Sequence, residues 1–396
     1  MKRILMIAPF SYPVAGAEAI VNIKLLKSLT KSEKFEIDLV SKKYISINYP
    51  SGELESYGVK LKSIHIGCVE NKVNLKTLFQ HIACLFTLGV SFKGCHWAYS
   101  VRGIVKKLIR ENTYDYVLTK GELAIPLGNF ARKKGVKWIA TWNDPCPSSM
   151  YPAPYGRGLE YRGSIFDRAL IKMMRNADFH VYPNVRLANY MQNIIKASNS
   201  QIRIIPHVVL ENNRQVIKGD CLRLIHSGNL FPPRSPKTFL EAIRKFLNKY
   251  DKPKFRFSIL GNLSKEDQKF LFECGLNDYV EYLKPVEYSQ SLALLNKFDV
   301  AVIIEADCKE GIYLPTKVSD FMQSQIPIFS VSPSIGVLHD LYDEGNIPYF
   351  ADVKDVDSIV QTLDTIYKDF LCGSIKSNNV PNEYLPENVV ETYYNF

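Results

Sequence analysis

The feature that most constrains the fold of this chain is an alternation of short apolar segments with segments of helical periodicity, which runs through the sequence twice. Short apolar runs are typical of buried strands, and apolar residues at i, i+3 and i+4 are typical of amphipathic helices. Because strands joined by helices pair in parallel, each round predicts an α/β, doubly wound parallel sheet. In the first round, the expected strands are 4–10, 36–41, 59–66, 114–120, 136–142, 178–183 and 202–207. The expected helices are 18–30, 74–93, 96–111, 123–134, 163–176 and 185–196.

A polar segment without periodicity, residues 208–220, separates the two rounds and is interpreted as a linker. A chain of 396 residues is too long for one hydrophobic core and is long enough for two domains. We therefore predict a first domain over 1–207, a second over 221–375, and a terminal segment, 376–396, that packs back on the first. In the second round, the expected strands are 222–229, 254–261, 279–284, 298–304, 327–331 and 347–352. The expected helices are 236–249, 265–274, 288–297, one that begins after Thr316, and 356–370.

The composition is that of a soluble globular protein, with 46% hydrophobic and 23% charged residues. No run of 18 apolar residues occurs, so no membrane-spanning helix is expected. The apolar run at the start is too short for a signal peptide, which favours the cytoplasm. The 8 Cys residues show no metal-ligand spacing, so we expect reduced core cysteines rather than a metal site or disulfides.

The net charge of +10 is distributed unevenly along the chain. Residues 1–200 hold 29 Lys and Arg against 14 Asp and Glu, whereas residues 201–396 hold 21 against 26. This asymmetry indicates that the first half faces an anionic partner: a membrane surface, a phosphorylated acceptor or nucleic acid. The alternative is a basic surface that only keeps the protein soluble. Nucleic acid is the least favoured partner, because the cations are spread over many elements.

A candidate phosphate site lies in the stretch EGIYLPTKVSDFMQSQIPIF, residues 310–329. A strand, a loop containing Gly311 and a helix capped by Thr316 would place backbone N–H groups at the carboxyl edge of the sheet. Lys317 would add a cation for the same anion. Asp320, one turn later, could accept hydrogen bonds from ribose or sugar hydroxyls. The alternative is an ordinary loop whose Lys and Asp are solvated.

The first half offers candidates of its own. Gly16 would let the backbone approach a phosphate or sugar without a Cβ. Asn143 and Asp144 follow an expected strand at its carboxyl end, although the Asp-Pro step there could be only a turn. Glu18 could bind an acceptor or simply be an acid in the first helical turn. His207, at the hinge, is more often a structural residue.

Several of these stretches together resemble a known family. HSGNLFPPRSPKTFLEAI (226–243) is similar to a glycine-turn and basic-residue motif, and EGIYLPTKVSDFMQSQIPIFSVS (310–332) to a paired-acid motif. PVAGAEAIV (13–21) is similar to a glycine-rich loop, and WNDPCP (142–147) falls where relatives place a polar pair near the donor sugar. In this order and spacing they resemble the family-4 type glycosyltransferases. Those enzymes have the GT-B fold, in which two Rossmann-like domains face each other across a cleft.

The resemblance implies roles for individual residues. Arg234 and Lys317 would be the cations for the donor diphosphate, and Asp144 would be the third catalytic candidate. Gly228 belongs to the glycine turn, and Asn229 occupies the place where the family has an arginine. Gly311 and Thr316 would supply backbone donors for the diphosphate.

The paired acids depart from the family pattern. Asp320 matches the second acid, which would bind the ribose hydroxyls. The position of the first acid holds Ile312, so Glu310 could substitute for it, with Glu305 and Asp307 as further candidates. Asn143, beside Asp144, would contact the donor sugar.

The function implied is a retaining glycosyltransferase that uses a UDP- or GDP-sugar donor and needs no metal or cofactor. Its acceptor would be a glycan or a polyprenyl-diphosphate-linked sugar, as in capsule or O-antigen assembly. It would lie in the cytoplasm, and the further expectation is peripheral contact with the anionic inner face of the membrane. The alternatives are a nucleotide-sugar epimerase of the same fold and a catalytically silent sugar-nucleotide binder. Asp355-Val356-Asp357 has the form of a metal-binding motif, but we expect it to cap the helix that follows.

Overall fold

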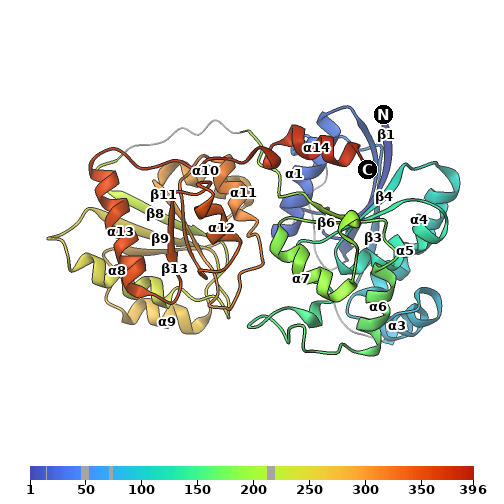
Figure 1. Ribbon diagram of the computed structural model, residues 1–396, viewed down its shortest axis with the longest axis horizontal. Helices are drawn as coiled ribbons and strands as arrows, with labels where there is room; N and C mark the ends of the chain where they lie inside the picture. Colours follow the sequence, from blue (N-terminus) through green and yellow to red (C-terminus); the bar gives the residue numbers. More distant parts are fainter. Residues whose placement is uncertain (15, 46–52, 71–74, 212–218) are drawn as a thin grey trace. The chain divides into compact units, whose positions relative to one another are not determined.

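The computed structural model describes residues 1–14, 16–45, 53–70, 75–211 and 219–396. The chain forms two compact units, each built around one parallel sheet (Figure 1). The N-terminal unit comprises Met1–Pro152, Gly156–Val208 and Glu383–Phe396, and the C-terminal unit comprises Ala153–Tyr155 and Val209–Asn382. Of the expected linker 208–220, residues 212–218 lie outside the described residues. The short segment 153–155, expected in the first domain, belongs to the C-terminal unit.

The sheet of the N-terminal unit has seven strands in the order β3-β2-β1-β4-β5-β6-β7, and every neighbouring pair is parallel. Its strands are β1 Lys2–Ile7, β2 Phe35–Tyr44, β3 Ser63–Val69, β4 Tyr116–Lys120, β5 Trp138–Thr141, β6 Phe179–Tyr182 and β7 Ile202–Ile204. Its helices are α1 Ala17–Lys31, α2 Glu53–Ser56, α3 Leu75–Leu88, α4 Cys95–Glu111, α5 Ile125–Lys133, α6 Ile165–Met174, α7 Val185–Ile195 and α14 Pro386–Tyr394.

The sheet of the C-terminal unit has six strands in the order β10-β9-β8-β11-β12-β13, again all parallel. Its strands are β8 Leu222–Ser227, β9 Phe255–Leu260, β10 Val280–Leu283, β11 Val300–Ile304, β12 Ile328–Ser332 and β13 Tyr349–Asp352. Its helices are α8 Lys237–Leu247, α9 Lys265–Glu273, α10 Tyr288–Leu294, α11 Lys317–Gln323, α12 Val337–Asp343 and α13 Val356–Leu371. The alternation expected from the sequence is therefore confirmed, while α2 and α12 were not expected.

Local sequence explains several helix ends. Ser164 and Asp167 form a reciprocal capping box at the start of α6, which satisfies two backbone donors. The side chain of Asp355 accepts hydrogen bonds from the backbone N–H groups of Asp357 and Ser358 at the start of α13. The prediction that this acidic pair serves as a helix cap is therefore confirmed.

The C-terminal helix α14 belongs to the N-terminal unit and contacts α1 (Figure 1). Its residues Val389, Val390 and Tyr393 are buried. The Tyr116 hydroxyl of β4 donates a hydrogen bond of 2.9 Å to the Tyr393 carbonyl, although 277 residues separate the two. The last residues of the chain thus complete the core of the first sheet.

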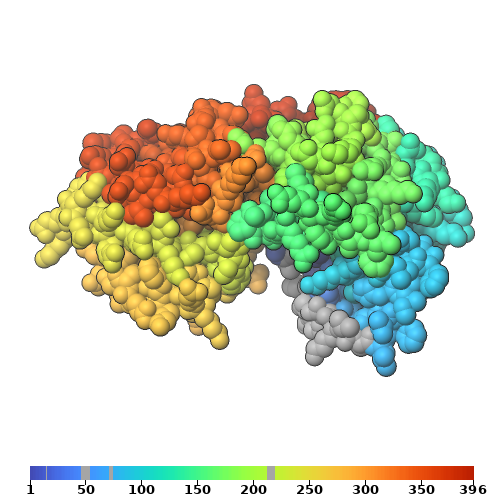
Figure 2. Space-filling view, turned by 60° about the horizontal axis from the view of Figure 1, so that its bottom comes forward, coloured from blue at the N-terminus to red at the C-terminus, as the bar shows by residue number. Residues whose placement is uncertain are grey.

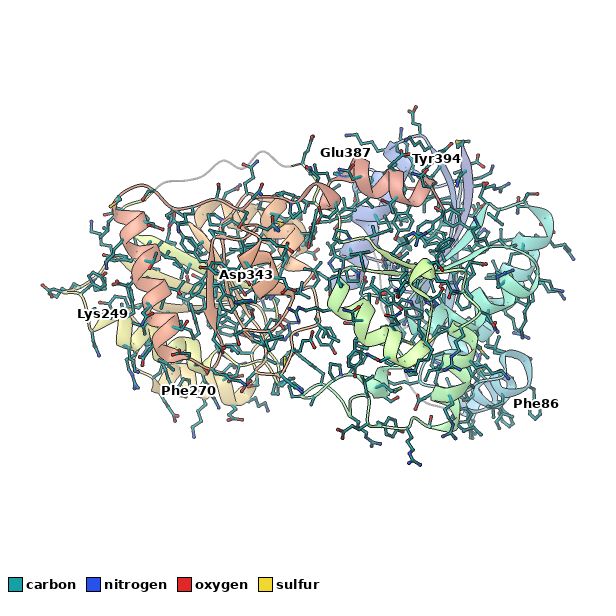
Figure 3. The ribbon with its side chains drawn as sticks, viewed as in Figure 1. Phe86, Lys249, Phe270, Asp343, Glu387 and Tyr394 are labelled. Carbon is teal, nitrogen blue, oxygen red and sulfur yellow. The ribbon has the colours of Figure 1, made fainter. Side chains whose placement is uncertain are left out.

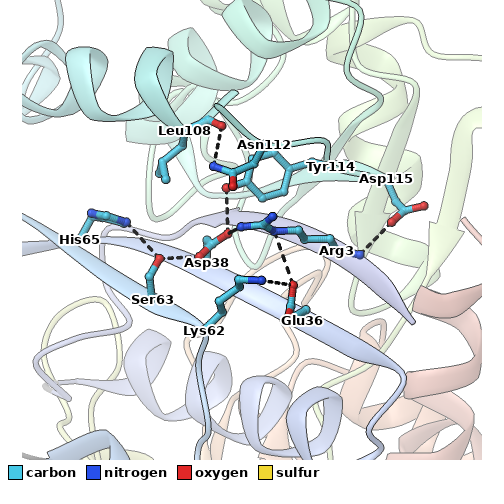
Figure 4. Close-up of polar contacts among 10 residues, drawn as sticks. All are labelled: Arg3, Glu36, Asp38, Lys62, Ser63, His65, Leu108, Asn112, Tyr114 and Asp115. Atoms are coloured by element: carbon cyan, nitrogen blue, oxygen red, sulfur yellow. Dashed lines mark hydrogen bonds and ion pairs between the residues drawn. The ribbon is translucent and has the colours of Figure 1, made fainter. Parts of the chain in front are cut away.

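A buried carboxylate joins the first strands of the N-terminal sheet (Figure 4). Asp38 of β2 accepts hydrogen bonds from the Ser63 hydroxyl, from the Tyr114 hydroxyl at 2.8 Å and from Arg3 Nη2 at 3.0 Å. Burial opposes its ionisation, but these hydrogen bonds outweigh burial and hold the pKa of Asp38 below its ordinary value. The network ties β1, β2 and β3 to Tyr114, which precedes β4.

Both sheets reverse their strand order beside the first strand of the unit. β1 lies between β2 and β4, and β8 lies between β9 and β11. The connections that leave β1 and β4, or β8 and β11, run in opposite directions and open a crevice at the carboxyl ends of the strands. Within the described residues, no helix is long and apolar enough to cross a membrane.

Candidate functional site

In the C-terminal unit, charged side chains gather where β8 and β11 end. Lys317, the first residue of α11, places its Nζ 3.2 Å from Nε2 of His226, which lies near the end of β8. The other ring nitrogen of His226, Nδ1, lies 3.0 Å from the carbonyl oxygen of Val302 on β11. A carbonyl can only accept, so Nδ1 carries the ring hydrogen and Nε2 accepts from the Lys317 ammonium. The buried histidine therefore holds the lysine in place.

Burial weakens the charge of this lysine. The pKa of Lys317 is lowered to about 8, mainly by desolvation and also by the nearby Arg234, while Glu305 and Asp320 oppose the shift. Burial, Lys317 and Arg234 together hold the pKa of His226 well below its ordinary value, so this ring is neutral. The cation at this site is thus the lysine and not the histidine.

Arg234 and Glu305 complete the cluster. Nη1 of Arg234, in the loop after β8, lies 3.6 Å from Oε1 of Glu305, the residue that follows β11. The side chain of Glu305 is 14% exposed, and its Oε2 accepts from the Tyr155 hydroxyl at 3.5 Å. Burial raises the pKa of Glu305, while Arg234 and Lys317 oppose that rise. Arg234 and Lys317 thus lie in one cluster with the carboxylates of Glu305 and Asp320, where β8 and β11 end.

Gly228 is required beside Lys317 for two reasons. Its φ is +131°, a conformation that favours glycine, and a Cβ at this position would lie 2.6 Å from Lys317 Nζ. The adjoining Asn229 is exposed, and its Oδ1 accepts from the backbone N–H and the side-chain amide of Asn262 at 2.9 and 3.0 Å. Asn229 therefore ties the loop after β8 to the loop after β9.

The loop before α11 is anchored by backbone pairing. The N–H of Gly311 donates to the Ile335 carbonyl at 2.9 Å, and the Gly311 carbonyl accepts from the N–H of Val337 at 2.8 Å. A Cβ on Gly336 would lie 2.9 Å from the Gly311 oxygen, so this close approach requires glycine at position 336. Glu310, next to this pairing, is exposed.

The two other predicted site residues near the start of α11 are Thr316 and Asp320. Thr316 stands at the N-cap position, but its backbone is helical and its side chain makes no capping hydrogen bond, so the prediction of a threonine cap is wrong. Its hydroxyl does not reach an N–H because the cap geometry requires an extended backbone. Asp320 accepts a hydrogen bond of 2.7 Å from the Tyr288 hydroxyl, which fixes its carboxylate.

The structure thus brings Gly228, Arg234 and Lys317 together, as their predicted roles require. The acid that lies beside both cations is Glu305, and the role predicted for Glu310 stays a prediction. Asp307, the other acid considered, forms an ion pair with Lys354 in which both side chains are more than half exposed. Glu305 also lines a pocket of the C-terminal unit together with Tyr155, Cys308, Gly311, Tyr313 and Gly336.

The N-terminal unit carries a second charged group at the equivalent place. Lys120, the last residue of β4, is buried, and Glu18 lies in the first turn of α1. Burial raises the pKa of Glu18, and Asp144 raises it further, while Lys120 opposes the rise. Burial also lowers the pKa of Lys120, against the attraction of Glu18. Asp144 is exposed, and it lies close enough to Glu18 to affect its ionisation.

Asn143 and His207 line a cavity of the N-terminal unit together with Lys120. His207 is buried, and its two ring nitrogens have no hydrogen-bond partner among the described residues. Burial lowers the pKa of His207 to about 3, with further contributions from Lys120 and Lys24, so the ring is neutral.

Gly16 occupies the N-cap of α1 with φ +85°, and a Cβ there would meet no atom within 4 Å. Glycine is needed at position 16 for its backbone conformation rather than for space.

Three functional candidates escaped the sequence interpretation or were ranked low: Lys120, His226 and Glu305. Each lies at the carboxyl end of a strand that borders a reversal of strand order. Position within the sheet would have identified them, because crevices form at these strand ends. The local sequence alone shows only a polar residue at the end of an apolar run.

Comparison with known proteins supports the fold. No protein-family model and no curated protein matches the chain. A solved structure of the lipopolysaccharide outer core galactosyltransferase WaaB, in its apo form, is similar at 13% identity and a TM-score of 0.62, over 99% of this chain and 98% of that one. A mutant of S. aureus TarM in complex with Fondaparinux, alpha-GlcNAc-glycerol and UDP is similar at 12% identity and a TM-score of 0.63, over 100% and 99%.

A third similar structure is a UDP-N-acetylglucosamine 2-epimerase from Listeria monocytogenes, at 12% identity and a TM-score of 0.55, over 98% of this chain and 94% of that one. At these identities the likeness shows the fold and not the activity. The prediction of two doubly wound, Rossmann-like units of the GT-B type is therefore confirmed.

Proposed function

We propose that this protein is a glycosyltransferase that moves a sugar from a nucleotide-sugar donor, a UDP- or GDP-sugar, to a glycan or lipid-linked acceptor. The observation that carries the proposal is the pairing of Lys317 and Arg234 beside the glycine turn of Gly228, where β8 and β11 end. This is the crevice in which doubly wound sheets bind nucleotides. The proposal assigns the diphosphate to this crevice.

The chemistry requires such cations. As the bond between sugar and diphosphate breaks, negative charge grows on the leaving diphosphate, and fixed positive groups stabilise it. Arg234 and Lys317 would supply that stabilisation, so no metal or cofactor is assigned to the step. The neutral His226 ring would keep the Lys317 ammonium aimed at the phosphate oxygens, and backbone N–H groups near Gly311 and Thr316 would add hydrogen bonds.

The acids of the same unit would bind the hydroxyl groups of the donor. Asp320, fixed by Tyr288, is assigned to the ribose. Glu305 is assigned to the donor sugar in place of the missing first acid, because it lies beside both cations, while Glu310 would act there only after a rearrangement of its loop.

The N-terminal unit would hold the acceptor. Its basic composition suits a phosphorylated or lipid-diphosphate acceptor at an anionic membrane surface, as in capsule or O-antigen assembly on the cytoplasmic side. Asp144 and Asn143, with the cavity residue Lys120, are assigned to the acceptor and the reacting sugar, with retention of anomeric configuration. The similarity in fold to WaaB, described as a lipopolysaccharide outer core galactosyltransferase, and to TarM, solved with alpha-GlcNAc-glycerol and UDP, supports a saccharide as the acceptor.

A nucleotide-sugar epimerase is the second candidate, because an epimerase shares the fold and would use the same diphosphate site. The two activities differ in their products. An epimerase converts its nucleotide sugar without an acceptor, whereas a transferase releases the nucleoside diphosphate only when a sugar or water receives the glycosyl group.

The experiment that tests the donor site is thermal stability against a panel of UDP-, GDP-, ADP- and CMP-sugars, with EDTA present. A ligand at a hundred times its Kd adds about 2.7 kcal/mol, which raises Tm measurably. We expect one nucleotide class to stabilise the wild type, and Lys317→Ala and Arg234→Ala to lose the effect. Lys245→Ala and Arg256→Ala, at exposed positions of the same unit, are the matched controls and should keep it. The proposal is refuted if no nucleotide stabilises the wild type, or if the control variants lose the effect equally.

A further inference from the structure

Helix α3 of the N-terminal unit turns an apolar stripe toward solvent. Phe86 is 87% exposed, Leu75 is 75% exposed and Phe79 is 69% exposed. Leu78, Ile82 and Leu85 are also exposed, so the six side chains follow one another at i, i+3, i+4, i+7, i+10 and i+11 along one face. Figure 3 shows Phe86 at the outer edge of the unit.

This arrangement is the reverse of an ordinary surface helix, whose apolar stripe faces the core. The residues of α3 that are buried are Thr77 and Cys84, which are polar or small. A contiguous exposed apolar patch on a folded protein marks a site of interaction with another protein or with a membrane. We therefore expect the exposed apolar face of α3 to contact a partner.

Cations outnumber acids around α3, where Glu70 forms an ion pair of 3.5 Å with Lys76. No Asp or Glu occurs between Glu70 and Glu111, whereas Lys76, Lys93 and Arg102 lie on α3, on the loop after it and on α4. Lys76 and Lys93 are exposed, and Arg102 is near enough to influence the ionisation of Cys84 on α3. Further exposed cations on α4 are Lys106, Lys107 and Arg110. The segment forms one edge of the surface of the unit, light blue in Figure 2.

We propose that α3 is an interfacial helix that lies flat in the surface of an anionic lipid bilayer. Its 14 residues span about 21 Å, with the six apolar side chains inserted at the boundary between headgroups and acyl chains. The surrounding lysines and arginines contact the anionic headgroups and add electrostatic attraction near the surface. The proposal rests on this face alone and not on the donor site, so either could hold without the other.

The charge pattern favours a bilayer over a second copy of this chain. In a symmetric dimer formed through α3, the acid-free segment of one copy would face the same segment of the other. The excess of cations on one copy would then face the same excess on the other. An anionic membrane compensates the same charges.

Vesicle co-flotation of the full-length protein tests the proposal. Vesicles of phosphatidylglycerol and phosphatidylcholine are compared with vesicles of phosphatidylcholine alone, at low and high salt. We expect the wild type to float with anionic vesicles and to be released by salt in part, since insertion of the apolar stripe does not depend on charge.

The decisive variant is Phe79→Ser combined with Phe86→Ser, which removes the two largest side chains of the stripe. It should weaken binding to anionic vesicles by about 100-fold. The matched control is Phe272→Ser, at a phenylalanine of α9 in the C-terminal unit that is 71% exposed, and it should bind as the wild type does. Circular dichroism verifies that both variants are folded.

Three results would overturn the proposal. The first is equal flotation of the double variant and the wild type. The second is a wild type that floats with neither kind of vesicle. The third is a wild-type dimer in solution that the double variant converts to a monomer while vesicle binding is absent, because a second copy would then be the occupant of the stripe.

Discussion

The substitution Lys317→Met separates the stability of the C-terminal unit from its function. Lys317 is half-buried, and its pKa of about 8 lies well below the ordinary value of 10.5. Each pKa unit corresponds to 1.36 kcal/mol, so the charged lysine costs the folded unit about 3 kcal/mol at neutral pH. Methionine has a similar length and no charge. The variant should therefore be more stable than the wild type at pH 7, by up to about 3 kcal/mol.

The pH dependence of this gain has a defined sign. Between about pH 8 and 10.5 the unfolded wild type keeps a proton on Lys317 that the folded protein has released, so its free energy of unfolding rises with pH. The variant has no such group at this position and lacks that part of the rise. The advantage of the variant is therefore complete below about pH 8 and disappears by about pH 10.5.

The structure supplies an internal reference for the assay. The 3 Trp residues of the chain, Trp97, Trp138 and Trp142, all lie in the N-terminal unit, so tryptophan fluorescence reports on that unit. Hydrogen exchange of peptides from β8 and β11, followed by mass spectrometry in urea, reports on the C-terminal unit. Lys317→Met should slow exchange in β8 and β11 at pH 7 and leave the fluorescence transition unchanged.

Lys245→Met, at an exposed position of α8, is the control and should alter neither probe. A Lys317→Met variant that is no more stable than the wild type at pH 7 would refute the argument. So would a difference between the two proteins that is the same at pH 7 and at pH 10.5. The stabilised variant should at the same time lose its response to the nucleotide sugar, since the lost charge is the one assigned to the diphosphate.

Three further predictions follow from single contacts. Gly228→Ala should displace Lys317, because the added Cβ would lie 2.6 Å from its Nζ, and calorimetry should show weaker binding of UDP or GDP by about tenfold or more. Binding of the nucleoside diphosphate near pH 8.5 should take up a proton, because a phosphate raises the pKa of Lys317; isothermal titration in buffers of different ionisation enthalpy measures this uptake. Tyr116→Phe should destabilise the N-terminal unit by about 1 to 3 kcal/mol in a urea titration followed by fluorescence, because the Tyr393 carbonyl loses its donor.

Much of the fold could be predicted from the sequence because strand and helix periods are local properties. The expected strands and the long helices are present, with ends that differ by a few residues. The strand expected at 59–66 is β3, Ser63–Val69, because its pairing with β2 extends to Val69 opposite Tyr44. Helix α12 was missed because it is only seven residues long and begins where Gly336 pairs with Gly311, a contact between distant segments.

The candidate site was predicted less completely, because its residues converge only when the sheet forms. Lys317 was found from its place at the start of the helix that follows the Gly311 loop, and Arg234 by resemblance to a family motif. Glu305 was ranked below Glu310, since sequence distance from the motif cannot show which acid lies beside the cations. His226 gave no signal, because a buried histidine at the end of a strand looks like any core residue until its partner Lys317 is placed.

The two units place similar chemistry at the same point of their sheets. Lys120 with Glu18 lies where β1 and β4 diverge, and Lys317 with Glu305 lies where β8 and β11 diverge. In both pairs burial lowers the pKa of the lysine and raises that of the acid. Buried charges of this kind cost stability, and removing them from a packed core is often neutral or favourable.

Such pairs are not needed to hold the sheets together, because aliphatic strands and buried aromatic side chains form the cores of both units. Buried ionisable groups with shifted pKa values are common where a protein binds or transforms a ligand. Both pairs lie at a reversal of strand order. At that point the connections after neighbouring strands run to opposite sides of the sheet, which opens a crevice lined by polar groups. The N-terminal pair, of which the sequence indicated only Glu18, is therefore as good a candidate for ligand binding as the C-terminal pair. Substitutions at Lys120 and Glu18 belong in any search for the acceptor.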